Sequence, residues 1–459
     1  MENIVMIGQL LLGLSILIGL HEMGHMLAAK FFGMRVEKFS IGFPPKIVGF
    51  KSGETEYSLG AIPLGGFVKI SGMIDESLDM DQMGAEPQPW EFRAKPAWQR
   101  LIVMMGGIIV NIVLGIIIFV FLTYRYGDTY IPREEVLEHG IVALEYGQQI
   151  GLKTGDKILK VNGQDYGRFS DVARGADVIL GENSYYTIER NGEILDIPIP
   201  SDLLEIFTDK NTADQFITIR MPFKVGEVVK GSNADKAGLQ AGDRIVAVNG
   251  TSFSYFDEFA DLLSKQSGGQ VQFTVDRAET SADAQAGVEN QYTVEDQNAS
   301  TVQLTAQVDE EGRVGFYPEP LLDVRQEQYG PIESLGKGTE KAFESVWLNI
   351  RGFGKIFSGD VNVSKSVKGP IGIREIYGGT WDWTRFWTIT GLLSMWLAFV
   401  NFLPIPALDG GHVMFLTYEM VSGSKPSDKF LEVAQKAGMI LIFAIMGLVL
   451  FNDIFNLFV

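Results

Sequence analysis

The chain has 459 residues, of which 46 % are apolar, and it carries a net charge of −19 and no cysteine. This length suits two to four domains. The lack of cysteine excludes disulfides and thiolate chemistry, and an acidic chain without a basic face argues against DNA or RNA as a partner.

Apolar residues gather in four windows of the chain. Each window holds about 20 mostly apolar residues, enough to cross a hydrocarbon core of about 30 Å. Buried core helices of a large soluble protein are the alternative, but LIVMMGGIIVNIVLGIIIFVFL is apolar on every face, which favours membrane spans. We therefore predict transmembrane helices over residues 1–30, 101–124, 386–410 and 436–459.

The first predicted span ends in the motif HEMGH, an instance of HExxH. On a helix, His21 and His25 lie one turn apart on the same face, so both imidazoles can reach one ion. Glu22 lies beside them, placed to take a proton from the attacking water. The alternative is a pair of core histidines at the membrane surface, yet two of the four histidines of the chain form this motif.

A segment rich in β-formers is predicted over 31–100, associated with the membrane. Within it, TEYSLGAIPLGGFVKISG at 55–72 alternates enough to form a hairpin. The edge of this hairpin can pair with an unwound substrate, and Gly65 and Gly66 would permit close backbone approach. A purely structural hairpin that plugs the membrane face is the alternative.

An acidic block separates the second and third spans, with 17 Lys and Arg against 35 Asp and Glu between 127 and 330. It contains a repeat, because GLKTGDKILKVNG at 151–163 matches GLQAGDRIVAVNG at 238–250 in eight of thirteen positions. The copies resemble PDZ domains, which we predict over 127–221 and 222–325. Such domains bind extended peptides by strand addition; a spacer or steric filter over the membrane part is the alternative.

An amphipathic helix is predicted over 331–358, where apolar residues recur at three and four positions. It would lie on the outer leaflet or against the spans, although a soluble helix packed on the second PDZ copy has the same pattern. Lys and Arg are more frequent near the ends of the segments 30–100 and 410–436. By this bias, these segments are cytoplasmic and the acidic block lies outside.

A zinc site of a hydrolase needs a third protein ligand, and the nearest residues after HEMGH offer none. NFLPIPALDGGH at 401–412 places Asp409 at the end of the third span. An ionisable residue at membrane depth is costly and therefore suggests function. Pro404 and Pro406 break the helix there, and the glycines that follow Asp409 let the backbone bend. A turn-forming aspartate is the alternative, and His412 is a less favoured ligand.

Together these motifs resemble the site-2 protease family of intramembrane zinc metalloproteases, and within it the bacterial branch that regulates sigma-E and carries tandem PDZ domains. HEMGH matches the HExxH motif of the family, LDGG at 408–411 matches its LDG motif, and the order span, span, PDZ, PDZ, span, span covers nearly the whole chain. One departure is GIIVN at 107–111, where Ile108 replaces the proline of a GPxxN motif. Asn111 remains, so local helix geometry is affected rather than catalysis.

The resemblance implies that His21, His25 and Asp409 bind Zn²⁺, that Glu22 is the base and that Asn401 contacts the substrate. It implies an α-helical membrane protein with four transmembrane helices, a membrane-associated β-hairpin segment and two inserted mixed α/β PDZ-like domains. The expected location is a bacterial inner membrane, with the active site near the cytoplasmic side and the PDZ domains in the periplasm.

The expected activity is an intramembrane zinc endopeptidase that cuts transmembrane segments of single-pass proteins after a first trimming cut. By resemblance, the substrates would be an anti-sigma factor of an envelope stress response and spent signal peptides. A non-catalytic membrane scaffold that presents PDZ domains to partners is the alternative, and it leaves HExxH and Asp409 unexplained. A metal transporter is weaker, because four spans offer little other ionisable lining.

Overall fold

The computed structural model describes residues 2–73, 86–175, 178, 181, 183–200, 203, 216–278, 299–358 and 376–455. Within this part the chain forms two compact units. The first comprises Met1–Asp128 and Glu327–Val459, and the second comprises Thr129–Gln326.

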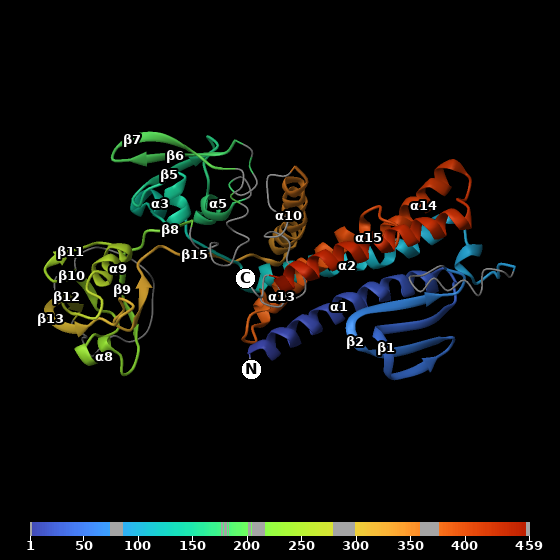
Figure 1. Cartoon of the computed structure of the whole chain (residues 1–459), viewed down its shortest axis with the longest axis horizontal. Coiled ribbons are helices and arrows are strands. Elements are labelled where there is room, and N and C mark those ends of the chain that lie inside the picture. Colours follow the sequence, from blue (N-terminus) through green and yellow to red (C-terminus); the bar gives the residue numbers. More distant parts are fainter. Residues whose placement is uncertain are drawn as a thin grey trace. The chain divides into compact units, whose positions relative to one another are not determined.

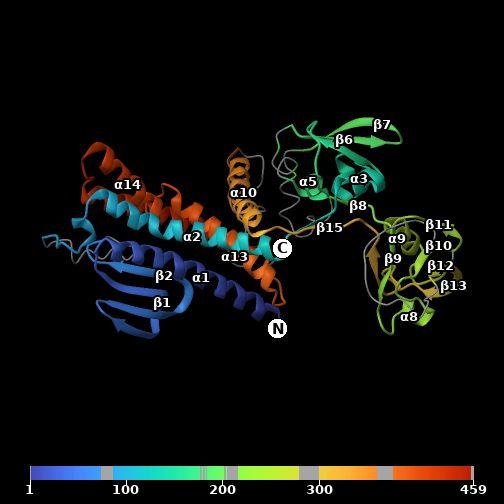
Figure 2. The ribbon, with the colours of Figure 1, turned by 180° about the vertical axis from the view of Figure 1, so that it is seen from behind.

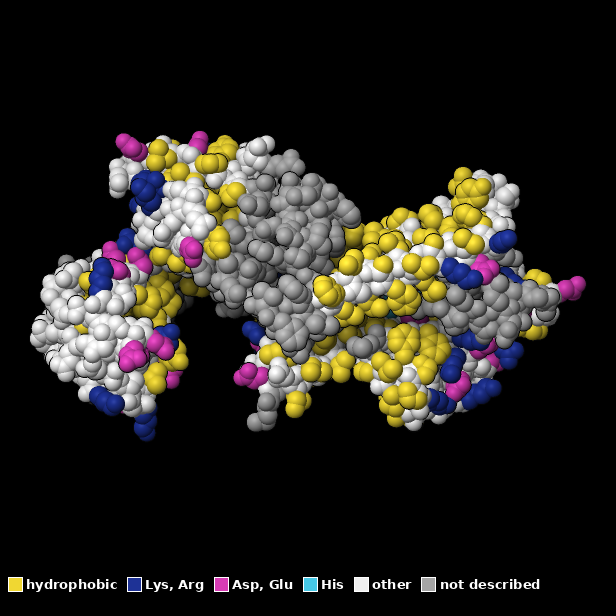
Figure 3. All heavy atoms as spheres, viewed as in Figure 1, with side chains coloured by type: hydrophobic (Ala, Val, Ile, Leu, Met, Phe, Trp, Pro, Cys, Tyr) yellow, Lys and Arg dark blue, Asp and Glu magenta, His cyan; other side chains and the backbone are white. Residues whose placement is uncertain are grey.

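Long helices dominate the first unit (Figure 1). They are α1 (Glu2–Phe31), α2 (Ala97–Tyr126), α10 (Pro331–Ser358), α13 (Trp383–Phe402), α14 (Asp409–Ser422) and α15 (Asp428–Phe455). Among the described residues, three helices are long and apolar enough to cross a membrane: α1, α2 and the part of α15 over Lys429–Phe451. Yellow apolar side chains cover much of the visible surface of this helical unit (Figure 3).

The helix predicted over 386–410 is shorter than expected. It ends at Phe402, and Leu403 has an extended backbone with φ −61° and ψ 140°. The residue before a proline avoids the helical region, so Pro404 stops α13. A loop follows, and Asp409 begins a new helix, α14, instead of ending the third span.

Helices α1 and α2 are in backbone contact where they cross. A Cβ on Gly24 would lie 2.3 Å from the carbonyl oxygen of Gly106. Helix α13 packs on another part of α2, where Gly115 leaves room for Met395 and a Cβ at Gly115 would lie 2.5 Å from its sulfur. Small residues of this kind allow close helix packing in lipid, where hydrophobic burial does not drive association.

A β-hairpin lies beside α1 (Figure 2). Its strands are β1 (Val36–Ser52) and β2 (Thr55–Ile70). Phe39 pairs with both Tyr57 and Val68, so the two ends of β2 flank the same part of β1. The sequence alternation predicted a hairpin within residues 55–72. This prediction is wrong, because β1 inserts between the two ends of that segment.

Helix α10 packs across α2 through small side chains. Ala342 is fully buried, and a Cβ at Gly338 would lie 2.4 Å from the Cα of Val120. Lys341 forms an ion pair with Asp128 just beyond α2. The opposite face exposes apolar side chains such as Trp347. The amphipathic helix predicted over 331–358 is present; its place on a membrane leaflet stays a prediction.

The second unit consists of two similar halves, each with its own hydrophobic core. The first contains α3 (Arg133–His139), β4 (Ile141–Ala143), α4 (Glu145–Gln149), β5 (Lys157–Val161), α5 (Phe169–Arg174), β6 (Tyr185–Arg190), β7 (Glu193–Pro198) and β8 (Ile217–Ile219). The second contains β9 (Phe223–Val228), α8 (Asn233–Ala237), β10 (Arg244–Val248), β11 (Thr251–Ser252), α9 (Phe256–Ser264), β12 (Gln270–Ala278), β13 (Ala299–Gln307) and β14 (Phe316–Pro320). The short elements η1 (Phe92–Ala94), β3 (Asp128–Tyr130) and β15 (Arg325–Glu327) complete the elements of the described residues.

The halves repeat their buried ion pairs as well as their sequence. Arg190 contacts Asp156 at 2.6 Å, and Arg277 contacts Asp243 at the same distance. Both aspartates are 1 % exposed. Each belongs to the Gly-Asp turn of the repeated motif, so the repeat in the sequence corresponds to a repeated structural unit with a polar anchor.

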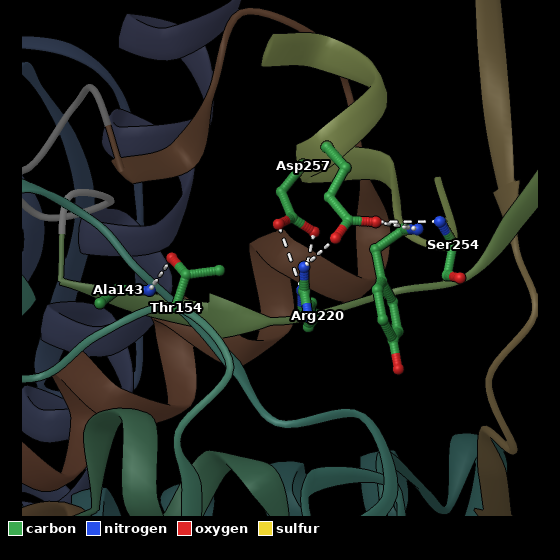
Figure 4. A network of polar contacts seen from close by, with 7 residues as sticks. Ala143, Thr154, Arg220, Ser254 and Asp257 are labelled. Carbon is green, nitrogen blue, oxygen red and sulfur yellow. Dashed lines mark hydrogen bonds and ion pairs between the residues drawn. The ribbon is translucent and has the colours of Figure 1, made fainter. Parts of the chain in front are cut away.

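Arg220 links the two halves (Figure 4). Its backbone N–H donates to the carbonyl of Gly140 in the first half. Its guanidinium donates to Asp257 at 3.2 Å and to Glu258 at 2.7 Å, both at the start of α9. It also lies over the ring of Tyr255, 4.1 Å from the centroid. Three contacts of one side chain therefore tie the second half to the end of the first.

Candidate metal centre

The two histidines of HEMGH lie on one face of α1, as their spacing predicts. Their ring centroids are 4.8 Å apart, and their Nε2 atoms are 3.2 Å apart. Both residues are buried, His21 at 7 % exposure and His25 at 5 %. Burial of two polar rings side by side is costly unless each nitrogen has a partner, so the partners of the four ring nitrogens decide what this site can hold.

Asp409 comes from the other end of the chain to face both rings. Its Oδ2 lies 3.1 Å from Nε2 of His21 and 3.3 Å from Nε2 of His25. The glycines after Asp409 explain how this position is reached. A Cβ at Gly410 would lie 2.2 Å from the carbonyl oxygen of Leu403, and one at Gly411 would lie 2.6 Å from that of Ile405. Only glycine lets the first turn of α14 pack against the loop after α13.

These three side chains fit a metal ion. Their potential ligand atoms all lie within 4.8 Å of one another. The Oδ2 of Asp409 is buried and accepts no hydrogen bond from the described residues, so it is available as a ligand. Two imidazole nitrogens and one carboxylate oxygen are a donor set that zinc takes in catalytic sites, where a fourth position stays open.

Glu22 and Asn401 lie at the same cavity, which has a volume of about 580 Å³. His21, Glu22, His25 and Asp409 line it together. The amide nitrogen of Asn401 is 3.4 Å from Nε2 of His21. The structure thus brings together every residue that the sequence suggested for the metal, for the base and for contact with the substrate. His412 also lines this cavity but is not in the cluster of potential ligands among the described residues.

The end of β2 forms another wall of the cavity, from Gly65 to Ile70. Both glycines are closely packed. A Cβ at Gly65 would lie 2.1 Å from the ring of Phe43, and one at Gly66 would lie 2.8 Å from the carbonyl oxygen of Ser40. These positions therefore require glycine for packing within the hairpin, in addition to any approach of a substrate backbone.

Sequence reasoning missed the contribution of α2. The carbonyl oxygen of Val103 lies 2.8 Å from Nδ1 of His25, and the amide of Asn111 lies 3.1 Å from Nδ1 of His21. The spacing of four between Gly107 and Asn111 was visible as a signal, because it places both on one helix face. A backbone carbonyl such as that of Val103 has no signature in the sequence.

Comparison with known proteins extends the similarity beyond the metal cluster. The sequence profile of peptidase family M50 matches residues 9–445. A putative zinc metalloprotease of Neisseria meningitidis is 30 % identical over 470 residues, which cover 96 % of this chain and 97 % of that protein. The protease RseP of Yersinia pestis and the regulator of sigma-E protease RseP of Escherichia coli are each 28 % identical, with the same shares covered.

Proposed function

Because this chain belongs to peptidase family M50, the site-2 proteases, and is a zinc metalloendopeptidase, we propose that His21, His25 and Asp409 bind its Zn²⁺ cofactor. The observation that carries this assignment is the buried Oδ2 of Asp409, which faces both Nε2 atoms at 3.1 and 3.3 Å. Zinc bound there would supply Lewis-acid chemistry, making a water more acidic and polarising the scissile carbonyl.

Glu22 is the general base in this proposal. It follows His21 directly and lines the cavity beside both rings. Its carboxylate takes the proton from the attacking water and then delivers it to the leaving amine. Asn401, at 3.4 Å from His21, holds either the substrate backbone or the developing oxyanion through its amide.

The substrate is a transmembrane segment of a single-pass protein. The cavity lies between α1 and the loop after α13, so the peptide bond to be cut must enter the space between these elements of the first unit. Freeing a helical peptide bond in lipid costs several kcal/mol, and β2 offers replacement partners along Gly65–Ile70. The name shared by several relatives, regulator of sigma-E protease, supports an anti-sigma factor as substrate, with spent signal peptides as a second class.

The membrane arrangement has four spans, with α13 as the third beside α1, α2 and α15. In this arrangement the protein lies in a bacterial inner membrane, the metal centre is near the cytoplasmic side, and the two halves of the second unit are periplasmic PDZ-like domains. They admit substrates that have already been trimmed, either by excluding bulky outer domains or by binding the new peptide end.

Glu22→Gln tests the assignment of the base. We expect the variant to keep wild-type zinc content and to lose cleavage of a model single-pass substrate in detergent. A photoreactive residue in place of Lys69, on the cavity wall, should then crosslink to the uncleaved substrate. The matched control is the same residue in place of Lys51, which is exposed on β1 and should not crosslink.

Three outcomes would contradict the proposal or a part of it. Cleavage that persists in Glu22→Gln would remove Glu22 as the base. Absence of zinc from the wild-type protein, with no cleavage in either form, would favour the non-catalytic scaffold. Crosslinking at position 51 as strong as at position 69 would remove the pairing of β2 with the substrate while leaving the chemistry intact.

A further inference from the structure

Helix α2 presents three residues to the metal site at intervals of four. Val103, Gly107 and Asn111 lie one turn apart, and each faces a histidine ring. A Cβ at Gly107 would lie 2.5 Å from Nε2 of His25 and 2.6 Å from the ring of His21. Gly107 therefore leaves the space that both rings occupy next to α2, between a hydrogen-bonding residue on either side.

The two nitrogens of each ring have different partners. The Nε2 atoms of His21 and His25 face Asp409, whereas the Nδ1 atoms face α2. A neutral imidazole has one N–H and one lone pair. A metal on Nε2 needs the lone pair there, so the proton must be on Nδ1, and the residue opposite Nδ1 must be an acceptor.

For His25 this condition is met by the backbone. The carbonyl oxygen of Val103 can only accept, and it lies 2.8 Å from Nδ1. The N–H of His25 therefore points at α2, and its Nε2 lone pair points at the carboxylate of Asp409.

For His21 the acceptor has to be the side chain of Asn111. This side chain is fully buried, and its amide lies 3.1 Å from Nδ1. With the amide nitrogen turned toward a protonated Nδ1, two N–H groups would oppose each other, and the oxygen Oδ1 would stay buried without a partner. Rotation of the amide by half a turn places Oδ1 at Nδ1 instead, and amide orientation is assigned from such partners.

We propose that Asn111 is a positioning residue for zinc, whose amide oxygen accepts the Nδ1–H of His21 and so holds the Nε2 lone pair toward the metal. The inference rests on the proposed assignment of His21 as a ligand. The backbone of Asn111 is itself anchored, because Ser394 of α13 donates to its carbonyl oxygen at 2.8 Å. Two helices thus fix the acceptor that orients a ligand on a third.

Replacement of Asn111 separates this role from simple packing. Asn111→Leu keeps the size but removes the acceptor, and we expect zinc to bind about 10–100-fold more weakly, as for other residues that orient metal ligands. Asn111→Asp keeps an acceptor at the same atom and should restore zinc affinity to within a few-fold of wild type. Chelator competition on the full-length protein in detergent measures both, and excess zinc should restore cleavage to Asn111→Leu.

The control is Ile109→Ala, whose side chain is 47 % exposed on the same helix and should leave zinc affinity unchanged. Equal weakening in the leucine and aspartate variants would mean that Asn111 only packs, and would overturn the inference. Wild-type affinity in Asn111→Leu would overturn it as well. His21→Ala distinguishes the ligand role of His21 from the positioning role of Asn111. If His21→Ala retains zinc, the proposed ligand set fails. If His21→Ala loses zinc while Asn111→Leu retains wild-type affinity, only the inference about Asn111 fails.

Discussion

Gly24→Ala should damage the metal centre although Gly24 binds nothing. Gly24 lies between the two histidines of HEMGH, at the point where α1 crosses α2. A Cβ there would lie 2.3 Å from the carbonyl oxygen of Gly106, where ordinary contacts begin at 3.4 Å. The added methyl group must therefore move the two helices apart by about 1 Å, or force an equal local distortion.

The displacement acts directly on the proposed metal ligands. His25 is on α1 and its acceptor, the carbonyl of Val103, is on α2 at 2.8 Å. A separation of about 1 Å lengthens this contact beyond hydrogen-bond range. We expect zinc affinity to fall about 10–100-fold, as when an orienting partner is lost. Turnover of the remaining zinc-loaded enzyme should fall about 100-fold, the usual effect of a 1 Å misplacement. Overpacking itself costs about 1–3 kcal/mol.

Chelator competition and cleavage of a single-pass substrate, both on the full chain in detergent, measure these losses. Gly8→Ala is the matched control, because it lies on the same helix and a Cβ there meets nothing within 4 Å. It should behave as wild type in both assays. Wild-type zinc affinity and turnover in Gly24→Ala would refute the reasoning, since the crossing would then tolerate a side chain.

Two predictions concern the second unit. Asp243→Asn should destabilise the second half of this unit by about 3 kcal/mol, which is the low end for a broken buried ion pair because the Arg277 side chain keeps 24 % exposure. Limited proteolysis of the full chain should then cut the second half first. Unchanged resistance to proteolysis would contradict this prediction. Burial raises the pKa of Glu258, but hydrogen bonds from Ser254, Tyr255 and Arg220 outweigh it and hold the pKa below 4.5. A lowered carboxylate pKa stabilises the fold above the ordinary value, and this contribution is lost as the pH falls through the lowered one. The protection factor of the Arg220 amide against hydrogen exchange, which corrects for the intrinsic pH dependence, should therefore fall below about pH 4.5 in the wild type and lose this dependence in Glu258→Gln.

The sequence predicted the residues of the site that carry a charge or a ring nitrogen. His21 and His25 follow from a local helical spacing, and Asp409 follows from the cost of placing a carboxylate at membrane depth. Asn401 came from family resemblance alone. The contributions of α2 could not be predicted in the same way, because a backbone carbonyl has no signature and Gly107 resembles any other glycine of an apolar helix. Asn111 was visible, but its partner was not.

The fold was predictable where composition decides it. Helices α1, α2 and α15 are apolar on most faces, whereas α13 mixes Arg, Thr and Trp with its apolar residues. Among the described residues only the first three meet the length and apolarity of a span, so a span at α13 stays a proposal. The hairpin shows the limit of periodicity. Alternation predicts strand over 55–72 but not its partner, and register depends on distant contacts. Here β1 inserts between the two ends of β2.

The contact between α1 and α2 has two effects that can be separated. In lipid, helices associate by close packing of small residues, because hydrophobic burial does not distinguish a neighbouring helix from acyl chains. The contact of Gly24 with Gly106 meets this need, and the same approach brings the backbone of Val103 within reach of His25. A variant at Gly24 should therefore lose stability and zinc affinity together. Asn111 lies away from the crossing point, so its replacement by leucine should lower zinc affinity while the helix packing stays intact.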